Sequence, residues 1–142
     1  MAISIKTPWH VWVVGIVSLL WNGFGAYDYV MTQTQNEEYL SGFSEEQLTY
    51  FETFPLWTDA LWAIAIWTSV AGSICILLRM KLAELLFFIS IVGFLGNTIY
   101  YVFINPLPGV SWVNHAFTGV IFVSLVLSWI YTRAMSKKGV LR

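Results

Sequence analysis

Two asparagines lie inside long apolar stretches of the chain, where an amide needs a partner. Asn22 lies eight residues before the end of the stretch 9–30, and Asn97 lies seven residues before the end of the stretch 82–104. A helix rises about 1.5 Å per residue, so both amides are expected ~10 to 12 Å below the same boundary of a membrane. At such a depth an amide either binds another protein group or faces a water-filled space.

Hydroxyl, imidazole and aromatic side chains are expected at or above the level of these amides. Aromatic walls with a few amide and hydroxyl groups suit small neutral solutes such as sugars, so we predict a ligand site here. Its candidate binding residues are Asn22, Asn97, Thr118, His115, Tyr100 and Trp62, with Trp21 and Phe117 as further wall residues. The candidate entrance residues are Asp28, Asp59 and Tyr29.

The opposite halves of the same stretches are apolar and contain neither an acid nor an amide before Glu84. The sequence therefore predicts a polar vestibule toward one side of a membrane and an apolar plug toward the other. A second interpretation stays open. In it, Asn22 and Asn97 hydrogen-bond each other or a backbone carbonyl and only hold helices together, while Asp28 and Asp59 reach interfacial water.

No pattern typical of an enzyme accompanies this site. A haem with two histidine ligands needs both at one depth, whereas His10 and His115 lie near opposite boundaries. Asp28, Asp59 and His115 could form a metal site with two carboxylates, but no spacing motif such as HExxH accompanies them. The sequence therefore predicts no metal and no cofactor, and a metal or quinone enzyme is only the last of three hypotheses.

Four apolar stretches must position these residues. Each has 21 to 23 residues, close to the roughly 20 that cross a bilayer core as a helix. Backbone amides in hydrocarbon must be paired within the segment, and the stretches lack the alternation of a barrel strand. We therefore predict an all-α fold, a four-helix transmembrane bundle in a single integral-membrane domain over residues 1–142. The predicted spans are 9–30, 57–78, 82–104 and 112–132.

The composition agrees with a bilayer as the surroundings of the chain. Apolar residues make up 58% of it and charged residues only 11%, whereas soluble domains carry about 25% charged residues. The net charge of -1 leaves no basic stripe for phosphates, which excludes a nucleic-acid partner. The single cysteine, Cys75, excludes a disulfide framework and CxxC redox chemistry.

All basic residues lie on one side of the four predicted spans, and they are Lys6, Arg79, Lys81, Arg133, Lys137, Lys138 and Arg142. The positive-inside rule then places both termini in the cytoplasm. The short connection 79–81 makes the second and third spans antiparallel neighbours. We expect Glu84 to pair with a loop cation near this surface.

The acidic loop 31–56 on the other side contains the signature of a short helix. Ser44 with Gln47 three residues later forms a capping box, and Pro55 limits the helix at its other end. We predict a short amphipathic helix in this outer loop, lying on the membrane surface or over the end of the bundle. Its apolar groups are Leu48, Phe51 and Phe54.

Small residues at helical spacing mark the faces on which the spans pack, because they let helices in lipid approach closely. These faces consist of Gly15, Ser18, Asn22, Gly25 and Ala26 in the first span, Ala65, Ser69 and Ser73 in the second, and Ser90, Gly93 and Asn97 in the third. We expect them to form the centre of the bundle.

The first span and its outer exit resemble a family of small four-span proteobacterial inner-membrane proteins. The resemblance is carried by residues 21–36, which read WNGFGAYDYVMTQTQN, and residues 7–9 and 139–142 look similar too. Such proteins often carry the automated name "sugar transporter". The resemblance implies an inner-membrane protein with signature residues at the outer mouth, namely Asn22, Asp28, Tyr29, Gln33, Thr34 and Asn36.

Two functional hypotheses follow. In the first, the protein binds or transports a small neutral solute through the outward-facing vestibule. Fewer than five helices rarely enclose a conduction path, so transport would require a homo-oligomer. In the second, the protein is a non-transporting accessory or scaffold subunit that docks to a larger membrane complex.

Overall fold

The computed structural model describes residues 5–142, and its helices follow the predicted spans closely. The four long helices are α1 (Trp9–Gln33), α4 (Leu56–Leu77), α5 (Leu82–Ile99) and α6 (Trp112–Lys137). Two short helices, α2 (Glu37–Leu40) and α3 (Glu45–Glu52), lie between α1 and α4, and a π-helical segment, η1 (Tyr100–Ile104), extends α5. The all-α fold and the four predicted spans are confirmed.

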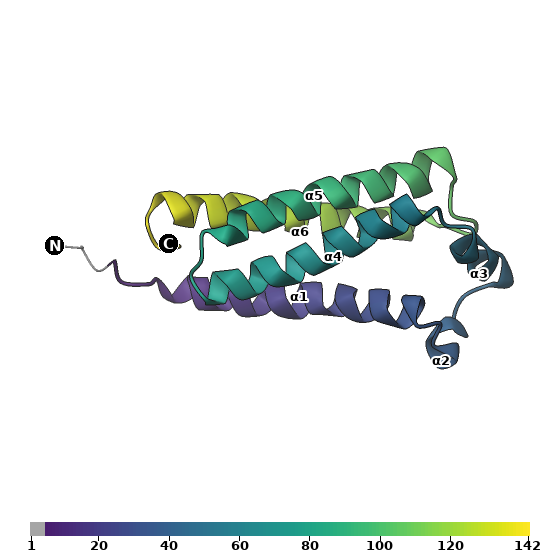
Figure 1. Ribbon diagram of the computed structural model, residues 1–142, viewed down its shortest axis with the longest axis horizontal. Coiled ribbons are helices and arrows are strands. Elements are labelled where there is room, and N and C mark those ends of the chain that lie inside the picture. The colour runs from purple at the N-terminus through teal and green to yellow at the C-terminus, as the bar shows by residue number, and fades with distance from the viewer. Residues whose placement is uncertain (1–4) are drawn as a thin grey trace.

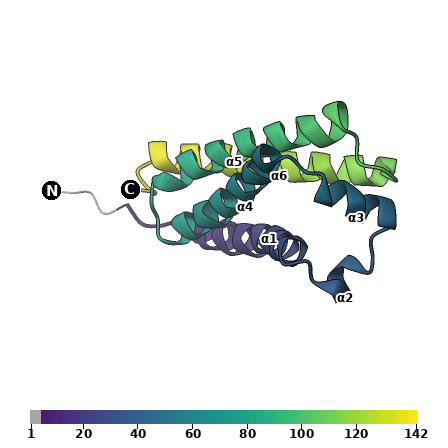
Figure 2. The same ribbon diagram turned by 45° about the vertical axis from the view of Figure 1, so that its right-hand side comes forward.

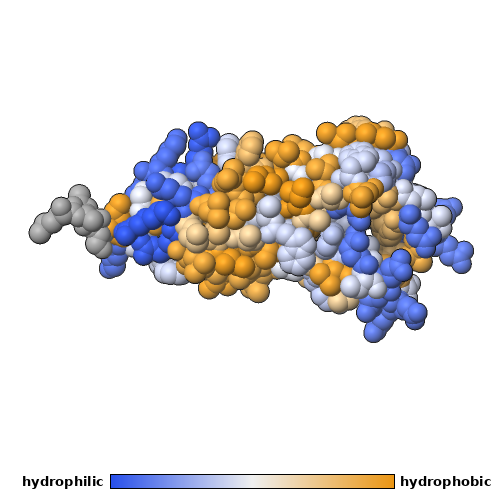
Figure 3. Space-filling view, in the orientation of Figure 1, coloured by the Kyte–Doolittle hydropathy of each residue, from blue (hydrophilic) through white to orange (hydrophobic). Residues whose placement is uncertain are grey.

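All four long helices, with η1 counted as part of α5, are long and apolar enough to cross a membrane. On the face shown in Figure 3, hydrophobic side chains cover most of the middle of the molecule, and hydrophilic side chains gather toward its two ends. The chain is therefore a multi-pass membrane protein.

The helices are arranged in the order α1, α4, α5, α6. Helix α4 packs against both α1 and α5, and α5 also packs against α6, whereas the backbones of α1 and α6 barely approach each other. Ile5, the first residue that the structure describes, and the C-terminus lie at one end of the bundle, and α2 and α3 lie at the other (Figures 1 and 2). We refer to these as the terminal end and the loop end.

The contact between α4 and α5 is close because the residues on the facing surfaces are small. A Cβ atom added to Gly93 would lie 2.9 Å from the carbonyl oxygen of Leu61 and 3.1 Å from the backbone nitrogen of Ala65. The Ser90 hydroxyl donates a hydrogen bond across the same contact to the carbonyl of Ala65, at 2.7 Å. The predicted small-residue faces of these two helices therefore meet at the centre of the bundle.

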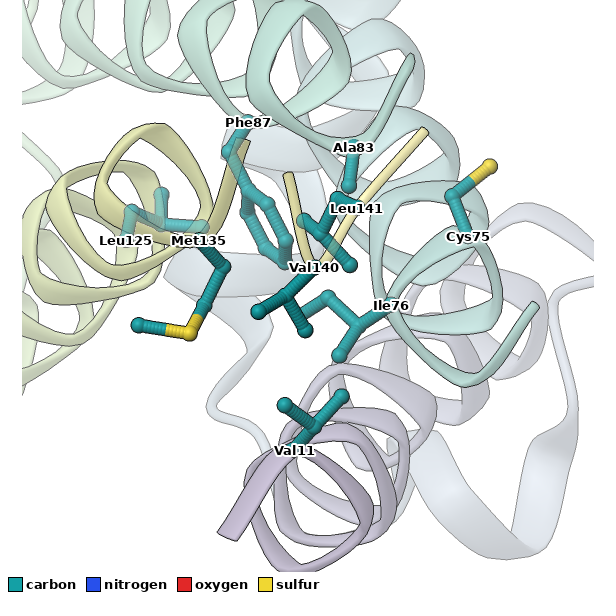
Figure 4. Close-up of a cluster of buried hydrophobic side chains, with 9 residues drawn as sticks. All are labelled: Val11, Cys75, Ile76, Ala83, Phe87, Leu125, Met135, Val140 and Leu141. Carbon is teal, nitrogen blue, oxygen red and sulfur yellow. The ribbon is translucent and has the colours of Figure 1, made fainter. Parts of the chain in front are cut away.

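A hydrophobic cluster closes the terminal end, in agreement with the apolar plug predicted there. All four long helices contribute to it, and its buried members are Val11, Cys75, Ile76, Ala83, Phe87, Leu125, Met135, Val140 and Leu141 (Figure 4). The side chains of Ile76, Phe87, Val140 and Leu141 converge in the middle of the four helices. The buried polar residues Asn22, Ser69 and Ser90 lie outside this cluster.

The residues after α6 complete this cluster, which the sequence did not predict. Gly139, at φ +69°, turns the chain back, and the side chain of Leu141 is fully buried. The backbone then pairs with the loop between α4 and α5. The N–H of Lys81 donates to the carbonyl of Arg142 at 2.9 Å, and the N–H of Arg142 donates to the carbonyl of Arg79 at 2.7 Å.

The partner of Glu84 differs from the expectation. Its carboxylate lies 3.9 Å from the Nε atom of Arg133, which belongs to the last turns of α6 and not to a loop. Both side chains are partly exposed to solvent, so the pair contributes little to stability. The expected loop cation is wrong because α5 and α6 pack side by side and bring Arg133 to this level.

The loop end carries the predicted helix and a second one that was not predicted. The capping box of α3 is confirmed, since the Ser44 hydroxyl accepts from the Gln47 N–H at 3.3 Å and Gln47 accepts from the Ser44 N–H at 3.2 Å. In α2, the side chain of Asn36 caps the helix by accepting from the Tyr39 N–H at 2.9 Å. We refer to residues 36–54 as the cover segment.

Candidate functional site

The loop-end half of the bundle encloses a cavity of about 500 Å³. All four long helices contribute to its wall, and the cover segment contributes Tyr39, Phe43, Tyr50, Phe51 and Phe54. Its deepest polar residues are Asn22, Ser69 and Ser90, near the middle of their helices. The predicted amphipathic helix α3 therefore lies over the end of the bundle, because two of its residues face the cavity.

Asn22 lies at the floor of this cavity and is only 8% exposed. Its amide NH2 donates to the hydroxyl of Ser73 at 3.0 Å, and that hydroxyl donates in turn to the carbonyl of Ser69 at 2.8 Å. Because the Ser73 hydrogen is already used, Ser73 can only accept from Asn22. The Asn22 amide therefore has one possible orientation, with its oxygen free of protein donors from residues 5–142.

Asn97 on α5 also binds α4, but nearer the loop end. Its NH2 group donates to the backbone carbonyl of Thr58 on α4, at 3.0 Å. Thr58 lies 15 residues before Ser73, the partner of Asn22, which is about 22 Å along α4. The predicted equal depth of the two amides is therefore wrong.

A carbonyl can only accept, so the orientation of the Asn97 amide is fixed as well. Asn22 and Asn97 each bind α4 and do not bind each other. Both amides connect helices, as the second interpretation expected, and both line the cavity.

Four of the nine predicted site residues line the cavity. They are Asn22, Asn97, Trp62 and Asp28, and the predicted wall residues Trp21 and Phe117 line it too. The predicted ligand contacts of these residues remain predictions.

The remaining five residues lie outside the cavity wall. His115 is exposed on α6, whereas Tyr100 is 7% exposed and accepts a hydrogen bond from the Asn105 side chain at 3.2 Å. Thr118 lies behind Tyr101, with 3.0 Å between their hydroxyl oxygens.

The other two lie at the entrance level. Asp59 accepts a hydrogen bond from Gln33 at 2.7 Å. The ring of Tyr29 packs edge-on against Trp62, with 4.9 Å between ring centroids. Tyr29 therefore supports the cavity wall from behind.

Sequence reasoning missed several wall residues, including Tyr39, Phe94, Tyr101 and Ile121. Tyr101 and Phe94 lie on the same helix as Asn97, so the helical repeat was an available signal for Phe94. Tyr39 belongs to the unpredicted helix α2, and nothing in its immediate sequence indicated that it contacts α1.

Tyr39 connects the cover segment to the first helix. Its hydroxyl donates a short hydrogen bond to the Asp28 carboxylate. Burial raises the pKa of Tyr39 well above its usual range, and the hydrogen bond to Asp28 raises it further. The phenol is therefore protonated at neutral pH and donates to a carboxylate at the mouth of the cavity.

Two residues of α3 connect the cover segment to the connection between η1 and α6. The hydroxyl of Tyr50 donates to the carbonyl of Asn105 at 2.5 Å, and the side-chain amide of Gln47 donates to the carbonyl of Pro108 at 3.3 Å. Tyr50 is 7% exposed. Burial raises the pKa of Tyr50 to about 12, with smaller contributions from the neighbouring Tyr100 and Tyr101.

Alkaline pH should weaken the attachment of the cover segment. The pKa of Tyr50 is higher in the folded protein than its ordinary value of 10, so the folded state holds the proton more tightly. The stabilisation is complete below pH 10 and is lost as pH rises through about 12. We expect the melting temperature in detergent to fall across this window. The fall should be smaller in Tyr50→Phe, and equal falls in both proteins would contradict the assignment.

One side of the cavity is bounded by a seam between α1 and α6 that side chains bridge. The Trp21 indole N–H donates to the hydroxyl of Ser124 at 3.1 Å, and the Trp21 ring lies 6.0 Å from that of Phe117. Toward the terminal end, His10 and Tyr131 form the second bridge, at 2.6 Å. The seam is thus held at two levels with few backbone contacts between the helices.

The structure does not form the metal site that the sequence left as an alternative. Within residues 5–142, no three His, Cys, Asp or Glu side chains are close enough together to hold a metal ion. Asp28 and Asp59 have different partners, Tyr39 and Gln33, and His115 is exposed on α6.

The cavity is thus a mainly aromatic and aliphatic space with the amide of Asn22 at its floor, the amide of Asn97 nearer the loop end and the carboxylate of Asp28 below the cover segment. Such a site can hold a small solute by hydrogen bonds to acceptors and by apolar contact.

Comparison of the chain with family models, curated proteins and solved structures finds no match to any of them.

Proposed function

We propose that this membrane protein binds a small solute in the loop-end cavity and takes part in its transport. The observation that carries the proposal is the pair of amide oxygens, on Asn22 and Asn97, that line a cavity of about 500 Å³ without protein donors from residues 5–142. An amide oxygen that lines a cavity without a protein donor can accept a hydrogen bond from a hydroxyl or N–H group of a solute.

The chemistry of the wall supports a solute with hydrogen-bond donors and an apolar body. At the floor, the hydroxyls of Ser69 and Ser90 donate to backbone carbonyls of α4, so the deep polar groups offer mainly acceptors. The hydroxyl groups of a neutral, sugar-like solute meet this requirement. The label of the family that residues 21–36 resemble agrees with such a solute, and membership of that family is part of the proposal.

The same proposal places the protein in a bacterial inner membrane with both termini in the cytoplasm. Its support is the position of the basic residues, which all lie at the terminal end or in the segment that leads to it. The cavity then opens toward the outer side, and the hydrophobic cluster closes the cytoplasmic side. Passage of a solute requires this cluster to open or a homo-oligomer to provide a path between copies.

Replacing Asn97 by leucine should abolish solute-induced stabilisation. We expect the melting temperature in detergent to rise for the wild type with at least one of glucose, glycerol and tryptophol. For Asn97→Leu we expect no rise, because the amide oxygen is gone and a larger apolar side chain takes its place in the cavity wall. Helix content and gel filtration check that the variant is folded.

Thr118→Val is the matched control. Thr118 is also a predicted site residue, but it lies behind Tyr101 and outside the cavity wall, so its variant should keep the stabilisation. Equal responses of Asn97→Leu and the wild type would contradict the proposal, and so would no response of the wild type to any probe.

A second candidate function is that of an accessory subunit of a larger membrane complex. It is favoured by an open apolar groove of about 460 Å³ along the seam, lined by Val14 and by five residues of α6. Purification from native membranes separates the two functions. A stoichiometric partner would support the accessory role, and a self-contained monomer or homo-oligomer would support solute binding.

A further inference from the structure

The charges of the molecule are separated between its two ends. Seven of the eight acidic residues lie at the loop end, and no lysine or arginine lies there. These acids are Asp28, Glu37, Glu38, Glu45, Glu46, Glu52 and Asp59. A mouth surrounded by charges of one sign attracts solutes of the opposite sign and repels those of the same sign.

Only one of these acids lines the cavity. Asp28 lies in the wall, whereas Asp59 and the five glutamates do not. One oxygen of the Asp28 carboxylate accepts from Tyr39. The other oxygen has no donor among the residues that the structure describes, although the cover segment lies directly above. The second carboxylate oxygen of Asp28 is therefore available to a solute in the space below the cover segment.

The rest of the wall favours the same kind of solute. Asn22 offers its amide oxygen as an acceptor at the floor and is more than nine-tenths buried, and Asn97 offers another nearer the loop end. The rings of Trp21, Phe24 and Phe117 line the sides. Aromatic faces attract cations and accommodate flat apolar groups. Acidic, amide and aromatic groups thus act together on one solute.

We infer that the cavity selects a solute with a protonated amine attached to an apolar, aromatic-sized body. This inference rests on the proposed function and specifies a positively charged solute in place of the neutral, sugar-like one. Asn22 and Asp28 are six residues apart on α1, which corresponds to about 9 Å along the helix axis. A solute of that length places its amine at Asp28 and a second donor at the floor.

Three indole compounds of similar shape provide the test. Tryptamine carries an ammonium group, tryptophol a neutral hydroxyl group and indole-3-acetate a carboxylate, and all three carry the same indole N–H donor. We expect titration calorimetry in detergent to give about tenfold tighter binding of tryptamine than of tryptophol, since a contact with one carboxylate in a partly buried site is worth at least this much. Indole-3-acetate should not bind measurably.

Two variants distinguish a direct contact between the amine and Asp28 from the electrostatic field of all the acidic residues at the loop end. Asp28→Asn keeps an acceptor for Tyr39 but removes the charge, so tryptamine should lose its tenfold advantage over tryptophol. Glu45→Gln removes one charge from the same end but lies outside the cavity wall, and it should change the ratio by less than twofold at 0.15 M salt, where exposed charges are screened.

The outcomes distinguish failure of the inference from failure of the proposed function. If tryptophol binds as tightly as tryptamine, or if Asp28→Asn leaves their ratio unchanged, the inference is overturned while solute binding stands. If none of the three compounds, nor glucose or glycerol, binds the wild type, the proposed function fails together with the inference.

Discussion

Replacement of Leu141 by alanine should lower the free energy of unfolding by about 2 to 5 kcal/mol, the range for removing a fully buried leucine from a packed core. Leu141 is fully buried among side chains from the ends of all four long helices. The variant leaves a space that rigid helices cannot fill. Thermal or denaturant unfolding in a mild detergent, followed by circular dichroism, measures the loss.

Leu85→Ala is the matched control for this experiment. Leu85 lies near the same end of the bundle, on α5, but it is 53% exposed on the surface that faces lipid. Removal of its side chain creates no cavity, and alanine is a good helix former, so the change should stay within about 0.5 kcal/mol. If the two variants lose equal stability, the residues after α6 do not complete the hydrophobic cluster at the terminal end.

Replacement of Gly93 by valine should have an effect of similar size. A Cβ atom at this position meets the Leu61 carbonyl oxygen at 2.9 Å, and this neighbour is backbone that cannot move without shifting α4. Overpacking of a helix contact costs roughly 1 to 3 kcal/mol or more, so we expect at least this loss. The floor of the cavity lies beside this contact, and a shift of α4 should also weaken solute binding.

Gly119→Val controls for the change of residue type. Gly119 is also in the middle of a long helix, but an added Cβ there meets no atom within 4 Å. The variant should unfold at nearly the wild-type temperature, because the only contribution left is the small difference in helix propensity. Similar melting temperatures for both variants would show that α4 and α5 do not pack as closely as described.

The fold could be predicted because the bilayer imposes a length and an apolar character on every span. The helix beginnings at Trp9, Leu82 and Trp112 agree with prediction to the residue. Helix α6 continues beyond the predicted Thr132 to Lys137 because a helix can extend past the apolar stretch into water. The packing of Leu141 into the cluster could not be predicted, since the few residues after the last span show no hydrophobic periodicity.

The depth of Asn22 was predictable, whereas Asn97 lies nearer the loop end than predicted, because η1 extends past the level at which α4 begins. The rotation of each helix was only partly predictable. Asn22 and Asn97 share a face with small residues, and this pattern fixes which side of α1 and α5 points inward. Helix α6 packs mainly against α5, and its sequence has no such face, so the positions of His115 and Thr118 around its axis were undetermined. Tyr100 begins the π-helical segment, whose wider turn brings Tyr101 to the cavity instead.

The unequal contacts among the four helices also determine the direction in which the bundle is softest. Separating α4 from α5 disrupts the close approach at Gly93 and the hydrogen bond of Ser90. Separating α1 from α6 breaks chiefly two side-chain hydrogen bonds, those of Trp21 and His10. We therefore expect thermal fluctuations to be largest in the direction that separates α1 from α6. They change the width of the cavity in that direction, parallel to the membrane plane.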